Sequence, residues 1–274
     1  PASPTLTRAV PGFSRPDARP LSARRWARMV GHRWIHASRN RFVYPQLRPV
    51  LASVVARSRF AEDKLDAALT RGFSQYVIVG AGLDSFALRR PELAGRLKVF
   101  EVDHPATQQT KKERLQQAGH ALPRHVEFLA VNFELENLAQ ALSRGSFQNS
   151  KPAFYSWLGV THYLTPAATA ATLKAIADIS APGSELVFDY SVPRKLLSPK
   201  DQRGAKWLGW LVKRQGEPFL GQMHPDDVAK TCTTLCFEIV EDISGAEQQQ
   251  RYFAGRPDGL VPTSGVRLIH LRRR

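Results

Sequence analysis

The chain contains few cysteines and no long apolar run. Cys232 and Cys236 are the only cysteines among 274 residues, and Thr-Thr-Leu separates them with no accompanying histidine or second cysteine pair. A zinc site needs that second pair of ligands, so we expect two packed core thiols rather than a metal site or a disulfide. No apolar stretch reaches the roughly 18 residues of a membrane-spanning helix. The composition therefore predicts a soluble, cytoplasmic protein without a metal.

Acidic residues are also scarce relative to basic ones. There are 24 aspartates and glutamates against 39 lysines and arginines, which gives a formal charge of +15. Such a charge attracts nucleic acid, an anionic membrane surface or an acidic small molecule. However, the sequence has neither a zinc-finger spacing nor an aromatic RNA-binding signature, and no base-flipping motif of the Asn/Asp-Pro-Pro-Tyr/Phe type. We therefore favour a solvated basic face or an acidic small ligand over nucleic acid.

A glycine-containing turn follows the clearest apolar run. Tyr76-Val77-Ile78-Val79 leads directly into Gly80-Ala81-Gly82, and Asp84-Ser85 then precede a new helical segment. A short apolar run is typical of a buried parallel strand, and glycines after it allow a tight turn with a ligand close to the backbone. An ordinary strand-to-helix turn is the alternative.

Two acids follow at the end of the next apolar run. In nucleotide-binding α/β folds, a ribose-binding acid follows the glycines by about 20 residues. Glu101 and Asp103 lie close to this spacing. A dinucleotide site has a third glycine at the position of Ser85, and Asp84 beside it would repel a diphosphate. A ligand with an adenosine and an ammonium but no phosphate fits better, and S-adenosylmethionine is the common one.

Strand and helix patterns alternate along most of the chain. Residues 1–22 predict a flexible arm and residues 23–274 a single domain, with a helical lead-in at 23–72 and a lid-like insertion at 192–226. The lead-in has apolar residues at Trp26, Val50, Val54 and Val55, among others. Strands are predicted at 75–79, 97–102, 126–131, 153–157, 185–190, 237–242 and 266–271, and the clearest helix at 166–180, capped by Thr165. This order predicts an α/β fold with a mainly parallel seven-stranded sheet and helices on both faces.

Several ordered segments together resemble the leucine carboxyl methyltransferase-like family. They are Gln75 to Arg89, Phe100 to Pro105 with Lys111 beyond, Trp157 to Leu164, Ala181 to Ser184 followed by Phe188-Asp189-Tyr190, and Gly216-Glu217-Pro218. The resemblance covers roughly residues 50 to 245. It implies a Rossmann-like class I methyltransferase that uses S-adenosylmethionine, and a relation to polyketide carboxyl O-methyltransferases of secondary metabolism.

The resemblance also implies roles for individual residues. Gly80 would allow close approach of the cofactor and Asp103 would bind its ribose, with Gly82, Asp84 and Glu101 beside them. Arg57, or Arg59 in a shifted register, would hold the methionine carboxylate. The family's Asp-Leu pair at the adenine reads Asn132-Phe133 here, and the asparagine can still accept a hydrogen bond. Leu158 replaces the glutamate of the family's Glu-Gly, which removes a carboxylate that helps to hold the methionine part.

The predicted chemistry is methyl transfer to an oxygen of a small molecule that bears a carboxylate or a hydroxyl. A carboxylate needs no general base, whereas a hydroxyl does. His162 and Tyr163 are the catalytic candidates after the fourth strand, although a packing histidine is the simpler interpretation of His162. Trp207, Trp210 and Arg214 in the insertion would receive an apolar acid.

Two further hypotheses stay open. Leu158 and Asn132 motivate a methyltransferase-fold protein whose cofactor site is weakened or repurposed, and which catalyses a different reaction or has a non-methylating role. Charge alone motivates a nucleic-acid methyltransferase or an RNA-binding module. Whether the chain forms a homo-oligomer is also open.

Overall fold

The computed structural model describes residues 40–133, 135–199, 201–202 and 220–274. The predicted arm at 1–22 and the beginning of the predicted helical lead-in lie outside these residues. So does the centre of the predicted insertion, including Trp207, Trp210 and Arg214.

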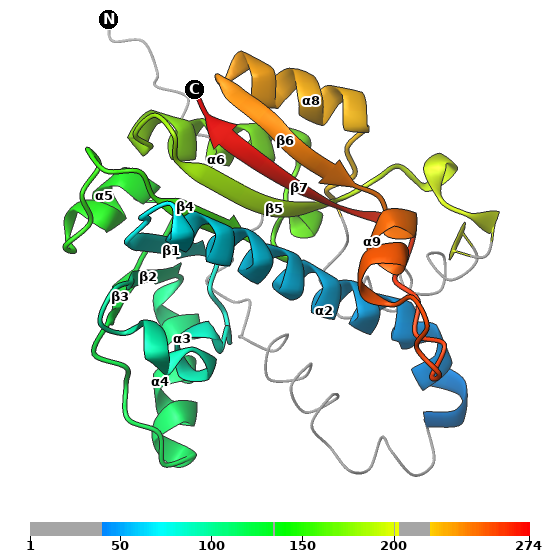
Figure 1. Ribbon diagram of the computed structural model, residues 1–274, viewed down its shortest axis with the longest axis horizontal. Helices are drawn as coiled ribbons and strands as arrows, with labels where there is room; N and C mark the ends of the chain where they lie inside the picture. The colour runs from blue at the N-terminus through cyan, green and yellow to red at the C-terminus, as the bar shows by residue number, and fades with distance from the viewer. Residues whose placement is uncertain (1–39, 134, 200, 203–219) are drawn as a thin grey trace, which may run out of the picture.

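A seven-stranded sheet with the order β3-β2-β1-β4-β5-β7-β6 forms the centre of the fold (Figure 1). Its strands are β1 (Gln75–Val79), β2 (Lys98–Asp103), β3 (Val126–Ala130), β4 (Phe154–Trp157), β5 (Glu185–Ser191), β6 (Phe237–Ile243) and β7 (Val266–Arg273). The first five strands are mutually parallel, and β7 runs antiparallel to both β5 and β6. The predicted mainly parallel α/β sheet is confirmed, and each strand lies within two residues of its predicted bounds.

Helices cover both faces of this sheet because successive side chains of each strand point in opposite directions. The helices are α2 (Asn40–Thr70), α3 (Phe86–Arg89), α4 (Pro105–Gln117), α5 (Leu138–Ser143), α6 (Pro166–Ile179), α8 (Pro225–Thr234) and α9 (Gly245–Tyr252). One apolar cluster packs α5, α6 and α8 against the sheet, and a second packs α2, α9 and the start of α3 against the other face. On β2, Phe100 belongs to the first cluster and Val99 to the second.

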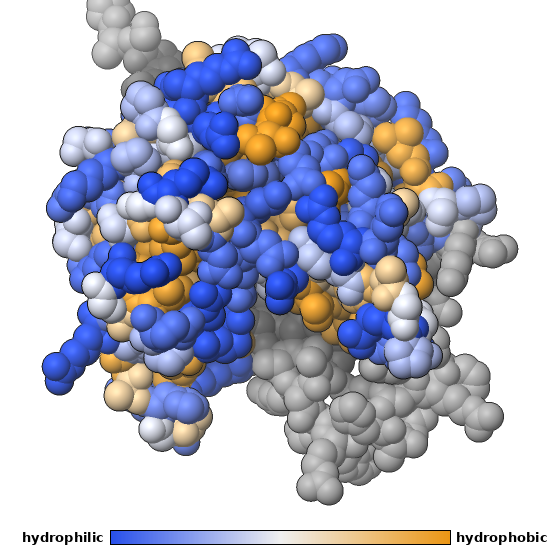
Figure 2. All heavy atoms as spheres, viewed as in Figure 1, coloured by the Kyte–Doolittle hydropathy of each residue, from blue (hydrophilic) through white to orange (hydrophobic). Residues whose placement is uncertain are grey.

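The long helix α2 contacts the sheet through small and aromatic residues rather than through its valines. Ala52, Ala56 and Phe60 are completely buried, whereas Val54 and Val55 are 38% and 58% exposed. The predicted helical lead-in is a helix here, but these two apolar residues of its pattern lie outside the buried stripe. Alanines let the helix backbone approach the sheet closely. The buried stripe of α2 follows the helical spacing of Ala52, Ala56 and Phe60. The face of the molecule that carries α2 is mostly hydrophilic, with separate small apolar patches (Figure 2).

Two further predictions concern helix ends. Thr165 caps α6, since its side chain accepts a hydrogen bond from the Ala168 amide, as predicted. The prediction of two core thiols is correct only for Cys232, which is buried on α8; Cys236 is exposed. Cys236 lies two residues beyond α8 in the left-handed region, with a φ of 59°, where the chain turns into β6. Turn geometry rather than helical periodicity decides its position.

Candidate functional site

The glycine turn after β1 brings three strand ends together. Gly80 and Gly82 have φ angles of +70° and +51°, a conformation that costs other residues energy. The Gly80 amide donates to the Val102 carbonyl at 2.8 Å, which ties the turn to β2. A Cβ on Gly80 would lie 2.7 Å from Cγ2 of Val160, a residue that follows β4. The turn therefore requires glycine both for its conformation and for the close approach of Val160.

Asp103 lies at the carboxyl end of β2 and faces this turn. Its Oδ2 accepts a hydrogen bond from the Gly82 amide, and its Oδ1 accepts one from the His104 amide at 2.6 Å. Burial raises the pKa of Asp103, against the opposing effect of these two amides. Each carboxylate oxygen retains a second lone pair that a ribose hydroxyl could use. Asp103 thus fits the role of ribose ligand.

Glu101 occupies the same face of β2 but is already engaged. It is buried, and its Oε2 accepts a hydrogen bond and ion pair from Nζ of Lys111, itself buried on α4. Burial raises the pKa of Glu101 to about 6, although Lys111 opposes this effect. Its predicted role as a cofactor ligand stays a prediction, and the contacts favour a role in fixing α4 to the sheet.

The raised pKa of Glu101 predicts a pH-dependent stability. Because folding raises the pKa from 4.5 to about 6, the contribution of Glu101 is complete below about pH 4.5 and is lost as the pH rises through about 6. The Glu101→Gln chain lacks this loss. Relative to that variant, the free energy of unfolding of the unmodified chain should fall by about 2 kcal/mol between about pH 4.5 and pH 7. Urea unfolding of both chains across this range measures the difference, and a difference independent of pH would contradict the prediction.

The adenine candidates lie at the neighbouring strand end. Asn132 and Phe133 follow β3, and the Val131 amide donates to the Asp103 carbonyl at 2.9 Å, which places this segment beside Asp103. Phe133 also packs against the cluster of α5, α6 and α8. Asp84 lies in the glycine turn, and its Oδ1 accepts a hydrogen bond from the Phe86 amide at 2.7 Å where α3 begins. Its predicted contact with the cofactor stays a prediction.

A polar cluster joins α2 to the ends of β4 and β5. Nη1 of Arg57 lies 3.1 Å from Oδ2 of Asp189, and the guanidinium packs directly over Gly159, where a Cβ would lie 2.5 Å from Nη2. Arg59 instead pairs with Asp63 and is 69% exposed. Of the two arginines that the sequence offers for the methionine carboxylate, Arg57 therefore faces the carboxyl edge of the sheet.

Both ring nitrogens of His162 are hydrogen-bonded. His162 belongs to the short helix η3 (Thr161–Tyr163), with Nε2 at 3.0 Å from Oδ2 of Asp189 and Nδ1 at 2.7 Å from Oγ of Ser191. Tyr163 follows it and is partly exposed. No local sequence pattern indicates individual roles for Asp189 and Ser191, because their partners come from distant segments. Leu158 packs against the cluster that contains α2, as expected for an apolar residue.

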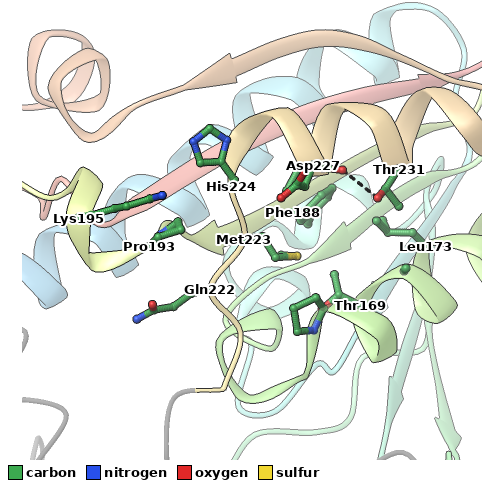
Figure 3. Close-up of a pocket in the computed structure, with 13 residues that line it drawn as sticks. Thr169, Leu173, Phe188, Pro193, Lys195, Gln222, Met223, His224, Asp227 and Thr231 are labelled. Atoms are coloured by element: carbon green, nitrogen blue, oxygen red, sulfur yellow. Dashed lines mark hydrogen bonds between the residues drawn. The ribbon is translucent and has the colours of Figure 1, made fainter.

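A cavity of about 440 Å³ lies between α6 and α8 (Figure 3). Its apolar lining includes Leu173, Phe188 and Met223, and its polar lining includes Lys195, His224 and Asp227. Phe188 lines this cavity and Asp189 pairs with Arg57, and the two are successive residues of β5. The cavity and the cluster of Arg57 and Asp189 therefore lie on opposite faces of that strand. The predicted insertion at 192–226 contributes part of the lining, namely Pro193, Lys195, Gln222, Met223 and His224. The acceptor residues predicted in it, Trp207, Trp210 and Arg214, lie outside the described residues.

Two features are absent from the described part of the chain. It contains no group of three or more histidine, cysteine, aspartate or glutamate residues that could hold a metal ion. None of the described helices has the length and hydropathy needed to span a bilayer.

Curated proteins similar to this chain are named as S-adenosylmethionine-dependent methyltransferases. YktD of Bacillus subtilis (strain 168), provisionally so named, is 33% identical over 216 residues, which span 79% of this chain and 71% of YktD. A provisionally named relative from Mycobacterium marinum (strain ATCC BAA-535 / M) is 35% identical over 142 residues. That match spans 52% of this chain and 46% of the relative, so the chain matches only about half the length of that protein.

Solved structures show the same fold at low sequence identity. Magnesium protoporphyrin IX methyltransferase (ChlM) from Synechocystis PCC 6803, crystallised with bound SAH, has a TM-score of 0.55 and 14% identity, with 93% of this chain and 95% of that chain covered. The leucine carboxyl methyltransferase family model matches residues 13–177, more than half of the chain. The glycine turn, Asp103 and the cluster of Arg57 and Asp189 lie at the strand ends where the sequence predicts the ribose and methionine parts of S-adenosylmethionine. The chain is thus a member of the leucine carboxyl methyltransferase family and an S-adenosylmethionine-dependent methyltransferase.

Proposed function

We propose that this methyltransferase esterifies the carboxylate of an apolar small molecule. The engagement of His162 carries the proposal, because both nitrogens of this ring already have hydrogen-bond partners. A hydroxyl acceptor must lose a proton during the reaction, which calls for a base. A carboxylate is ionised at neutral pH and needs none.

The reaction then requires mainly positioning from the protein. The cofactor supplies a methyl group on a sulfonium, which is already a good leaving group. With the cofactor bound, the acceptor carboxylate would become its methyl ester and the sulfonium would become the thioether of S-adenosylhomocysteine. No proton is transferred, so an aligned acceptor and a site closed to water account for the catalysis.

The cavity between α6 and α8 is our candidate for the apolar part of the acceptor. Pro166 on its wall follows η3 closely in the chain, and Gln222 on its wall forms a bridge with Ser191. The cavity therefore adjoins the end of β5 at which His162 is held. Lys195 on its lining is exposed, and its positive charge favours an acidic acceptor. Such methyl esters would fit the role in secondary metabolism that the sequence suggests.

Matched acids and alcohols test the proposal. The chain is incubated with S-adenosylmethionine and a panel of aromatic and medium-chain carboxylic acids, each paired with its primary alcohol. We expect S-adenosylhomocysteine release and a methylated product from acids, and we expect alkali to remove the methyl group, since esters hydrolyse whereas ethers do not. Methylation of alcohols alone, as alkali-stable ethers, would contradict the carboxylate proposal, as would no turnover with any acid.

A substitution in the cavity tests the location of the acceptor. Ala170→Trp places a large side chain in the cavity wall and should raise the KM of an accepted acid by roughly tenfold or more. The affinity for S-adenosylmethionine should not change, because the cofactor residues lie elsewhere along the sheet edge. An unchanged KM would show that the acceptor binds outside this cavity.

A further inference from the structure

Asp189 is the most completely engaged carboxylate near the site. Its side chain is fully buried on β5 and accepts three hydrogen bonds. Oδ1 accepts from the Gly159 amide at 2.6 Å, while Oδ2 lies 3.1 Å from Nη1 of Arg57 and 3.0 Å from Nε2 of His162. One aspartate thus connects helix α2, the turn after β4 and the short helix η3.

The donors around Asp189 stabilise its charged form. Burial by itself would raise the pKa of Asp189, but the Arg57 charge, His162 and the Gly159 amide hold the pKa well below its usual range. The group is therefore a carboxylate throughout the neutral range. An ionised, fully buried side chain is costly unless it is paired and hydrogen-bonded, as this one is.

Asp189 also brings a carboxylate to the turn that contains Leu158. Leu158 is apolar and packs against the cluster that contains α2. The following residue, Gly159, nevertheless binds a carboxylate through its amide, and this carboxylate comes from the adjacent strand β5. An acid is thus present at the turn after β4, although it is contributed by a residue about thirty positions further along the chain.

Arg57 retains hydrogen-bonding capacity beyond this ion pair. Asp189 takes one of its terminal nitrogens, and Arg57 makes no other hydrogen bond or ion pair within the described ranges. Its guanidinium is confined by packing over Gly159. A guanidinium fixed in this way has lost its side-chain freedom before a ligand carboxylate arrives, which improves affinity.

We infer that Asp189 is a positioning residue for the methionine end of the cofactor: it holds Arg57 against Gly159, so that the guanidinium is already in place for the methionine carboxylate. Asp189 does not itself contact the ligand. The inference rests on the cofactor of the family and is independent of the acceptor proposed above.

Three ligands distinguish binding at the methionine end of the cofactor site from binding at its adenosine end. S-adenosylmethionine and S-adenosylhomocysteine contain the methionine part, whereas 5′-methylthioadenosine has only the adenosine and a thioether. Calorimetric titration of the full chain with each ligand should show that Asp189→Asn weakens the first two by at least roughly tenfold. The affinity for 5′-methylthioadenosine should stay within about twofold, which a general loss of structure would not permit. Equal weakening of all three ligands, or no weakening of any, would overturn the inference.

Glu185→Gln is a matched control on the same strand. Glu185 is a buried carboxylate at the amino end of β5, paired with Arg71 at 2.6 Å and with His270 at 3.0 Å. Its replacement removes a comparable buried ion pair far from the carboxyl edge, so all three affinities should be unchanged. If Glu185→Gln weakened the same two ligands as Asp189→Asn, the loss of affinity would be due to lower stability, and the inference would be overturned.

One further variant keeps the test decisive if Asp189→Asn does not fold. Asp189→Glu retains the charge but displaces the guanidinium by one methylene, so the same ligand-selective weakening is expected. Equal weakening of all three ligands by Asp189→Glu, or no weakening of any, would overturn the inference.

Discussion

Replacement of Gly159 by alanine is expected to weaken S-adenosylmethionine binding by roughly thirtyfold to a hundredfold, about 2–3 kcal/mol. Gly159 has a φ of +73°, and a Cβ there would lie 2.5 to 2.7 Å from three atoms of the Arg57 guanidinium. The guanidinium must move away, which breaks its contact with Asp189. Calorimetric titration with the cofactor measures the loss of affinity. The left-handed backbone adds a loss of stability of about 1–2 kcal/mol.

Gly183→Ala provides the control for backbone strain. Gly183 has a φ of +83°, and a Cβ there would meet no atom within 4 Å. The two variants share the conformational penalty, but only Gly159→Ala displaces Arg57. We therefore expect Gly183→Ala to lose stability by a similar amount, measured by urea unfolding, and to keep its affinity for the cofactor. Equal affinities of the two variants would contradict the role assigned to Arg57.

Replacement of Asp103 by alanine is expected to weaken S-adenosylmethionine and 5′-methylthioadenosine equally, by roughly a hundredfold or more. Two hydrogen bonds from ribose hydroxyls to a carboxylate contribute about 3 kcal/mol or more in total. The substitution also releases the Gly82 amide, which Asp103 holds in the turn. Both ligands carry the ribose, so both titrations should show the loss.

The pattern across ligands distinguishes this variant from those at Asp189. Glu127→Gln is its control, since Glu127 lies on the neighbouring strand β3 and pairs with Lys98 away from the turn. Its affinities should equal those of the unmodified chain. A loss confined to S-adenosylmethionine in Asp103→Ala would place the ribose elsewhere, and a comparable loss in Glu101→Gln would show that Glu101 shares the role.

The strands and the glycine turn were predictable from the sequence because their signals are local. Buried parallel strands appear as short apolar runs, and the residues after each run identify the carboxyl edge. Gly80, Asp103 and Asn132 therefore fall at neighbouring strand ends once the strand order is known. The exposed Val54 and Val55 show the limit of this approach, because which stripe of a helix is buried depends on how closely its backbone packs against the sheet.

The sequence by itself determined the fold class, the cofactor and the glycine turn after the first strand. Only the tertiary structure showed that Lys111 engages Glu101, that Cys236 lies in an exposed turn and that Asp189 holds Arg57. Arg57 and Asp189 are 132 positions apart, so no local period or spacing relates them. Their contact exists because β4 and β5 pair in the sheet and α2 packs across both, and the same packing brings the Asp189 carboxylate to the Gly159 amide.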